Sequence, residues 1–136
     1  MMRQSIVIDA VLEKDTLLES AVFFAATLLR LSDTFFPFGL LSISGQIQSI
    51  FTQHGANVEM QGGMIEEIEW LLLELSFQAD NTRSVLIYNA QVESADTSTI
   101  DVIATKIIDH SGAETTQLFP YEFAGNQVCI GKPIVF

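Results

Sequence analysis

The chain has 136 residues, of which 49% are hydrophobic, and its formal net charge at pH 7 is −11. This length fits one domain spanning residues 1–136, and the apolar content excludes a disordered chain. Its six Lys and Arg residues are scattered and are outnumbered by 17 Asp and Glu residues, so neither nucleic acid nor an anionic membrane surface is an expected partner.

The first predicted element is a helix that begins near Asp15. Residues 1–14 fit an alternating strand and a helical turn about equally well, and they stay unassigned. Asp15 can cap the helix, and Thr16 and Glu19 have the spacing of a capping box. The helix is predicted to end at Ser32. Its apolar arc covers about half of the circumference, so we expect it to contact two neighbours.

Two strands and a second helix follow. A strand is predicted for residues 35–43, and after the turn Ser44-Gly45 the chain returns as a second strand over 46–52. The next loop covers residues 54–63, and the second helix is predicted for residues 64–79.

The C-terminal part of the chain is predicted to be strands. A β-branched run predicts a strand over residues 83–91. The longest predicted hairpin joins residues 100–109 to residues 114–123, because two β-branched and aromatic runs flank a short turn with a glycine. A last strand is predicted for residues 127–130.

These elements predict an α+β fold, with a mainly antiparallel sheet of about five to six strands and two helices packed on one face. The predicted order is α-β-β-α-β-β-β, with hairpin connections and no βαβ alternation. Roadblock-type and profilin-like folds have the same element order, which is an analogy of fold alone.

The sequence has no clear catalytic or metal-binding motif. His54 and His110 are the two histidines, and neither has a ligand at a characteristic spacing. Cys129 is the single cysteine and lies in a predicted strand, so we expect a buried thiol, a reducing compartment and a cytoplasmic location. The N-terminus reaches Asp9 too early for a signal peptide. We expect no cofactor and no metal.

Other motifs also favour structural interpretations. Gly62-Gly63 precedes a predicted helix, as in a phosphate loop, but no Lys-Ser/Thr follows it and Glu66 and Glu67 occupy the place of a phosphate. Phe35, Phe36 and Phe38 surround Pro37 before Gly39. This corner is predicted to be core, with glycine admitting a close neighbour; the alternative is the aromatic mouth of a pocket.

Three short motifs carry a resemblance to a known group of proteins. They are Phe36-Pro37-Phe38-Gly39, Asp109-His110-Ser111-Gly112 and Leu118-Phe119-Pro120-Tyr121. Together with the element order, over about residues 15 to 131, the chain resembles a group of small bacterial proteins with no assigned activity. The resemblance implies a bacterial cytoplasmic protein and supplies no catalytic residues.

The second helix carries two apolar stripes, which is one more than a sheet can cover. Trp70, Leu73 and Phe77 share a stripe opposite the one that suits the sheet. An exposed stripe of this kind requires a cover, which is either the first helix or a second copy of the chain. We expect Trp70, Leu73 and Phe77 to form a homodimer interface.

The expected function is therefore that of a non-enzymatic interaction protein that acts as a homodimer. An alternative is an acidic immunity-type protein that neutralises a basic toxin, since complementary charge speeds association. A further alternative is a small-molecule binder or enzyme that uses the corner at Phe35, Phe36 and Phe38.

Overall fold

The computed structural model describes residues 5–8, 16–43, 46–51, 61–78, 82–109 and 111–135, with the backbone alone at 5–8 and 61–62. It contains two helices, α1 (Thr16–Ser32) and α2 (Gln61–Ser76). The strands are β1 (Ser5–Ile8), β2 (Phe38–Ile43), β3 (Gln46–Phe51), β4 (Arg83–Glu93), β5 (Thr99–Ile108), β6 (Glu114–Ala124), β7 (Gln127–Ile130) and β8 (Ile134–Val135).

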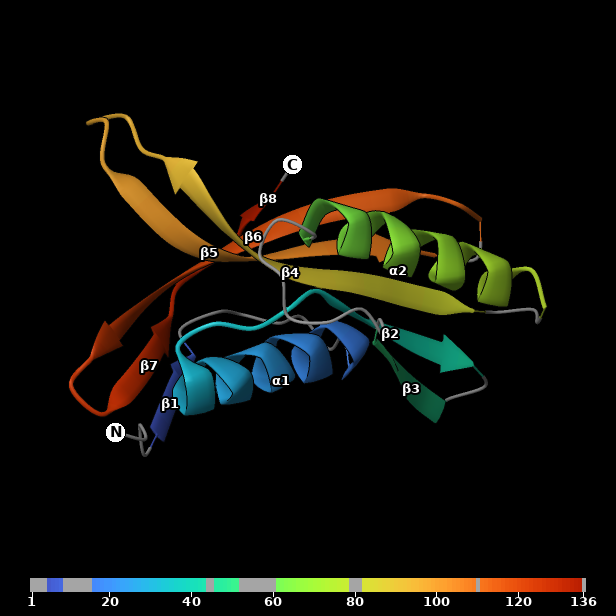
Figure 1. Ribbon diagram of the computed structural model, residues 1–136, viewed down its shortest axis with the longest axis horizontal. Coiled ribbons are helices and arrows are strands. Elements are labelled where there is room, and N and C mark those ends of the chain that lie inside the picture. The colour runs from blue at the N-terminus through green and yellow to red at the C-terminus, as the bar shows by residue number, and fades with distance from the viewer. Residues whose placement is uncertain are drawn as a thin grey trace.

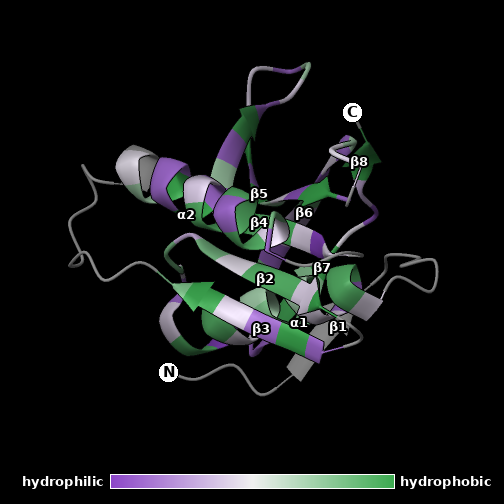
Figure 2. Cartoon of the chain, turned by 90° about the vertical axis from the view of Figure 1, so that its right-hand side faces the viewer, coloured by the Kyte–Doolittle hydropathy of each residue, from purple (hydrophilic) through white to green (hydrophobic). Residues whose placement is uncertain are grey.

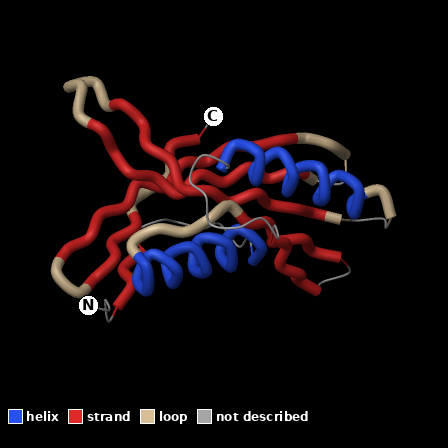
Figure 3. The backbone as a smooth tube through the Cα atoms, viewed as in Figure 1, coloured by secondary structure: helices blue, strands red, loops and turns tan. Residues whose placement is uncertain are grey.

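The described strands form one sheet in the order β1-β7-β6-β5-β4-β2-β3, with β8 paired to β6 (Figures 1 and 3). All of these pairs are antiparallel except that of β1 with β7, which is parallel. The predicted α+β fold and the element order from α1 to β7 are confirmed. The sheet has two strands more than the sequence predicted, β1 and β8.

The two helices lie on opposite faces of the sheet, and the prediction that both pack on one face is wrong. On β4, Val85 and Ile87 belong to the core cluster that contains α1. Leu86 belongs to the cluster that contains α2, and Tyr88 packs against it. Because successive side chains of a strand point to opposite faces, α1 covers one face and α2 covers the other. Figure 1 shows the sheet between the two helices.

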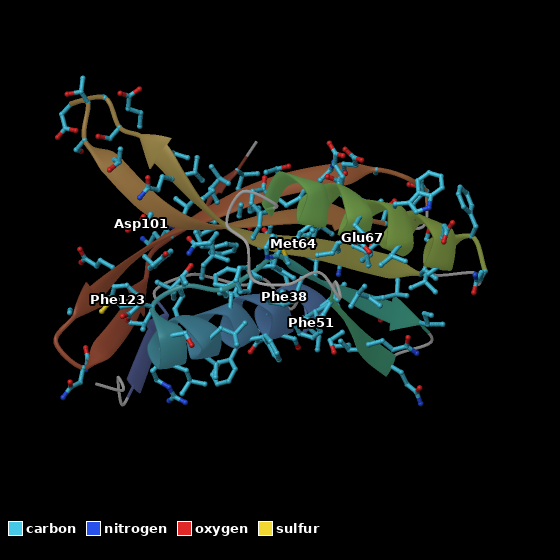
Figure 4. All side chains as sticks on the ribbon, in the orientation of Figure 1. Phe38, Phe51, Met64, Glu67, Asp101 and Phe123 are labelled. Atoms are coloured by element: carbon cyan, nitrogen blue, oxygen red, sulfur yellow. The ribbon has the colours of Figure 1, made fainter. Side chains whose placement is uncertain are left out.

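The core on the α1 face is the larger of the two. Strands β2, β4, β5, β6 and β7 all contribute buried side chains to it. Phe38 is fully buried, and its ring contacts those of Phe24, Phe35 and Phe51 at centroid distances of 5.0, 5.8 and 5.7 Å. Phe38 and Phe51 lie close together where α1 meets the sheet (Figure 4). The predicted assignment of Phe38 to the core agrees with this burial.

The core on the α2 face depends on Gly39. Ile68 and Leu72 of α2 are buried against this face together with Leu41 and Leu86. A Cβ placed on Gly39 would lie 3.0 Å from Ile68 Cγ2 and 3.1 Å from Leu72 Cδ1. The missing side chain of Gly39 therefore lets α2 approach β2 closely, as the sequence predicted for this glycine.

Several element boundaries differ from the predicted ones. The strand predicted from residue 35 begins at Phe38, because residues 34–37 are irregular. Helix α2 begins at Gln61, so Gly62 and Gly63 lie inside its first turn and do not end a loop. The pair Ile43–Gln46 leaves two residues for the turn between β2 and β3. Asp15, the turn Ser44-Gly45 and residues 54–60 of the loop predicted for 54–63 lie outside the described residues.

Aspartates organise two of the connections between strands. Asp96, between β4 and β5, accepts hydrogen bonds from the hydroxyls of Ser94 and Ser98. The bond from Ser94, followed by those from Ser98, lowers the pKa of Asp96 to about 2. Asp109 accepts bonds from the Ser111 amide at 2.9 Å and the Ala113 amide at 3.1 Å. The turn of the long hairpin thus follows the prediction, although His110 within it lies outside the described residues.

Candidate functional site

The outer side of α2 carries the most exposed apolar stripe of the described structure. Trp70, Leu73 and Phe77 are 62%, 43% and 82% exposed. The opposite side of the helix packs on the sheet through Ile68 and Leu72. Helix α1 lies across the sheet from this stripe, so the alternative in which α1 covers Trp70, Leu73 and Phe77 is wrong. Figure 2 shows α2 at the surface with apolar and polar residues alternating along it.

Three carboxylates lie beside Trp70 and Leu73 of this stripe. Trp70 and Leu73 line a hollow of about 280 Å³ together with Glu66, Glu69, Glu114 and Ile108. We call these residues, with Phe77, the α2 surface. Its three carboxylates come from two elements that lie far apart in the sequence, α2 and the start of β6. The surface therefore combines an exposed indole and aliphatic groups with negative charge.

The ammonium group of Lys106 offsets part of this charge. Lys106 on β5 donates a hydrogen bond to Glu69 at 3.2 Å and lies 3.6 Å from a carboxylate oxygen of Glu114. Partial burial disfavours the charged form of Lys106, but the bond with Glu69 and the attraction of Glu69 and Glu114 outweigh it, so the pKa of Lys106 is raised. Lys106 stays charged at neutral pH, and the hollow keeps a net negative charge.

The aromatic corner predicted from Phe35, Phe36 and Phe38 divides between core and surface. Phe35 and Phe38 are buried, whereas Phe36 is exposed. Phe35 and Phe36 line a second hollow of about 280 Å³, together with Leu28, Ser32, Thr34 and Phe51. Two hydroxyl groups are the polar side-chain groups among these lining residues. The hollow offers apolar contact and few groups that could orient a polar ligand.

A third hollow lies where β5 and β6 separate. Their last pair is Val102–Pro120, after which β6 pairs with β7 from Tyr121 onward. The space between the diverging strands has a volume of about 460 Å³, and its lining includes Ile100, Glu122 and Cys129. The Tyr121 hydroxyl donates a hydrogen bond to Asn89 Oδ1 at 2.9 Å. Burial of this hydroxyl raises the pKa of Tyr121.

The remaining predicted site residues do not form a cluster in the described structure. Cys129 is half-buried on β7 rather than fully buried as expected. In the part of the chain that the structure describes, no group of three or more His, Cys, Asp or Glu residues could hold a metal ion. His54 and His110 lie outside that part. The glutamates of α2 were expected to spread around the helix, but Glu66 and Glu69 line one hollow together with Glu114.

Comparison of the chain with protein-family models, with curated proteins and with solved structures gives no match. The resemblance to small bacterial proteins therefore stays a prediction. Neither described helix has both the length and the apolar character of a membrane span.

Proposed function

We propose that the chain is a non-enzymatic interaction protein that acts as a homodimer and binds a basic partner on the α2 surface. The observation that carries the basic partner is the exposure of Trp70, Leu73 and Phe77 next to a hollow with three carboxylates. Covering side chains of this size gains roughly 1.5–3 kcal/mol each. The single cysteine of the chain, Cys129, fits a reducing, cytoplasmic setting.

The charges of the α2 surface favour a basic partner. Glu66 and Glu114 lie beside the apolar stripe, and Lys106 is already paired with Glu69 and Glu114. A partner that placed Lys or Arg around an apolar contact would complement this surface, and opposite charges would speed its association. The whole chain, with a net charge of −11, would steer such a partner from a distance.

The same charges argue against a second copy of the chain on this surface. A two-fold contact between two α2 helices would bring Glu66, Glu69 and Glu74 of each copy near those of the other. Like charges at an interface cost free energy unless cations pair with them, and Lys106 already pairs with Glu69 and Glu114 of its own copy. We therefore place the homodimer interface on a different surface.

Neutralisation of a basic toxin is a second candidate, and the same carboxylates favour it. It predicts that charge dominates binding, so that neutralising Glu66 and Glu114 would raise the Kd more than changing Leu73 would. The proposed function predicts that the apolar stripe is needed as well.

A ligand site at Phe35 and Phe36 is less favoured, because the polar groups lining that hollow are the hydroxyls of Ser32 and Thr34.

The test uses Trp70, the single tryptophan of the chain, as a fluorescent reporter. The probe is a synthetic helical peptide of leucine and lysine with leucines spaced three and four residues apart. We expect it to shift the emission of Trp70 toward shorter wavelength, and we expect added salt to weaken its binding. Leu73→Glu, which keeps the reporter, should raise the Kd at least tenfold.

Two controls make this test specific. Phe23→Glu introduces the same charge at an exposed apolar position of α1 and should leave the Kd within about twofold. A peptide with glutamate in place of lysine should give no shift. The proposal fails if the acidic peptide shifts the emission equally, or if the basic peptide binds without any change at Trp70.

A further inference from the structure

We infer that the two copies of the proposed homodimer join through their β3 strands, which pair antiparallel across a two-fold axis. This inference rests on the proposed homodimer and names the surface that forms it. Strand β3 ends the described sheet, beyond its neighbour β2. Figure 2 shows β3 in front of the rest of the molecule on this side.

The residues of strand β3 itself include none of the charges or prolines by which proteins protect an edge strand. Its sequence is Gln46-Ile47-Gln48-Ser49-Ile50-Phe51, with no charged residue and no proline. Five of its six residues are exposed, and Ile50 is half-buried. An uncharged edge of this kind leaves a row of backbone groups ready to pair with another strand. A strand of a second chain can therefore pair with β3.

The surroundings of β3 are apolar. Phe51 contacts Phe24 of α1 at a ring-centroid distance of 6.1 Å, and both rings are partly exposed. Phe51 also lines the hollow beside Leu28 and Phe36. A strand that paired with β3 would place its own side chains next to this aromatic group and extend the larger core of the protein.

The distribution of charge favours a second copy as the occupant. Every copy carries a net charge of −11, so two copies meet at low electrostatic cost where neither presents acids. Strand β3 has no charged residue, and the residues lining the hollow beside it are also uncharged. The α2 surface has three carboxylates and is the less suitable face for self-association.

The side-chain pattern of β3 is self-complementary in one register. Phe51 lies opposite Phe38 on the α1 face, and Ile47 and Ser49 share that face because strand side chains alternate. With Ser49 opposite Ser49 of the second copy, Ile47 of each copy lies opposite Phe51 of the other. Pairs of an aromatic and a β-branched residue stabilise a sheet. The dimer would thus have one continuous sheet.

The first test is the mass in solution, measured by light scattering. Wild type should have twice the 15.0 kDa mass of the chain. Ser49→Lys should halve that mass and leave the circular dichroism spectrum unchanged, because it places two ammonium groups opposite each other at an exposed position. Trp70→Glu should remain a dimer, as should Gln127→Lys at an exposed position of β7.

The second test fixes the register and needs no disruptive change. In a Cys129→Ala background, Ser49→Cys should give a covalent dimer on mild oxidation, since opposite residues of antiparallel strands meet the distance requirement of a disulfide. Gln127→Cys in the same background should remain monomeric on a denaturing gel.

The outcomes separate this inference from the proposal beneath it. A wild-type monomer contradicts the homodimer itself, and would leave the β3 edge to a foreign chain. A wild-type dimer that Trp70→Glu splits while Ser49→Lys does not would keep the homodimer and overturn the β3 interface. If Ser49→Lys unfolds, the disulfide test decides, and equal cross-linking at positions 49 and 127 overturns the inference.

Discussion

Replacing Phe38 with alanine should lower the free energy of unfolding by roughly 3–5 kcal/mol. Phe38 is fully buried, and three aromatic rings contact it on the α1 face. Removing its ring therefore loses apolar burial and leaves a cavity that the neighbouring rings fill only in part. Chemical denaturation followed by circular dichroism measures the loss.

Phe36→Ala is the matched control for Phe38→Ala. Phe36 lies two residues earlier and is 40% exposed. Its truncation removes less buried surface and should cost less than half as much as that of Phe38. An unchanged midpoint for Phe38→Ala, or equal losses for the two variants, would contradict the assignment of Phe38 to the core.

Gly39→Ala should destabilise the protein by roughly 1–3 kcal/mol. The added methyl group would lie 3.0–3.2 Å from methyl groups of Ile68 and Leu72, which is closer than ordinary van der Waals contact. Helix α2 would have to move away from β2, or its side chains would have to leave their preferred rotamers. Thermal and chemical unfolding of the variant measure the cost.

A second glycine and a double mutant test this explanation. Gly63→Ala places its methyl group in open space within the first turn of α2, and it should stabilise the protein by up to about 1 kcal/mol. In a Leu72→Ala background, Gly39→Ala should cost less than it does in wild type, because the space for the methyl group is then available. Equal costs in both backgrounds would show that the strain at Gly39 does not come from Leu72.

Local patterns predicted the elements well where several signals agreed. The capping-box spacing of Thr16 and Glu19 and the wide apolar arc predicted α1, which begins at Thr16. The long hairpin followed from two β-branched runs around Gly112, whose φ of 87° suits a glycine. In these segments the propensity, the periodicity and the turn residues all favour the same structure.

The arrangement of the helices was missed, although the sequence carried a signal for it. Val85, Leu86 and Ile87 are consecutive apolar residues, and Val102, Ile103 and Ala104 repeat this pattern on β5. Such runs are typical of strands that are buried on both faces. They indicate a helix on each side of the sheet. In a strand covered on one face only, apolar and polar residues would alternate.

Other errors came from interactions that no local pattern contains. Residues 5–8 form a strand because they pair with β7, which lies near the other end of the chain. Helix α2 begins before its glycine pair, although glycine weakens a helix, because packing on the sheet outweighs intrinsic propensity. The position of β3 at the edge of the sheet depends on the strand order, which local periodicity does not determine.

The candidate surface was predicted only in part. The spacing of Trp70, Leu73 and Phe77 placed them on one stripe, and the structure leaves all three exposed. The contribution of Glu114 and the bridge through Lys106 depend on the pairing of β5 with β6 and on the packing of α2 over them. These contacts determine the charge of the surface, and they are the reason that we propose a basic partner.

The most direct test of the proposed function is the accessibility of Trp70 in the proposed dimer of the wild type. Acrylamide quenching of its fluorescence is measured at protein concentrations that span the dimer and the monomer. We expect the emission of a water-exposed indole, strong quenching and no dependence on concentration, because the α2 surface stays open when two copies join. A quencher-protected indole in the dimer that becomes accessible on dilution would place α2 between the copies and contradict the proposal.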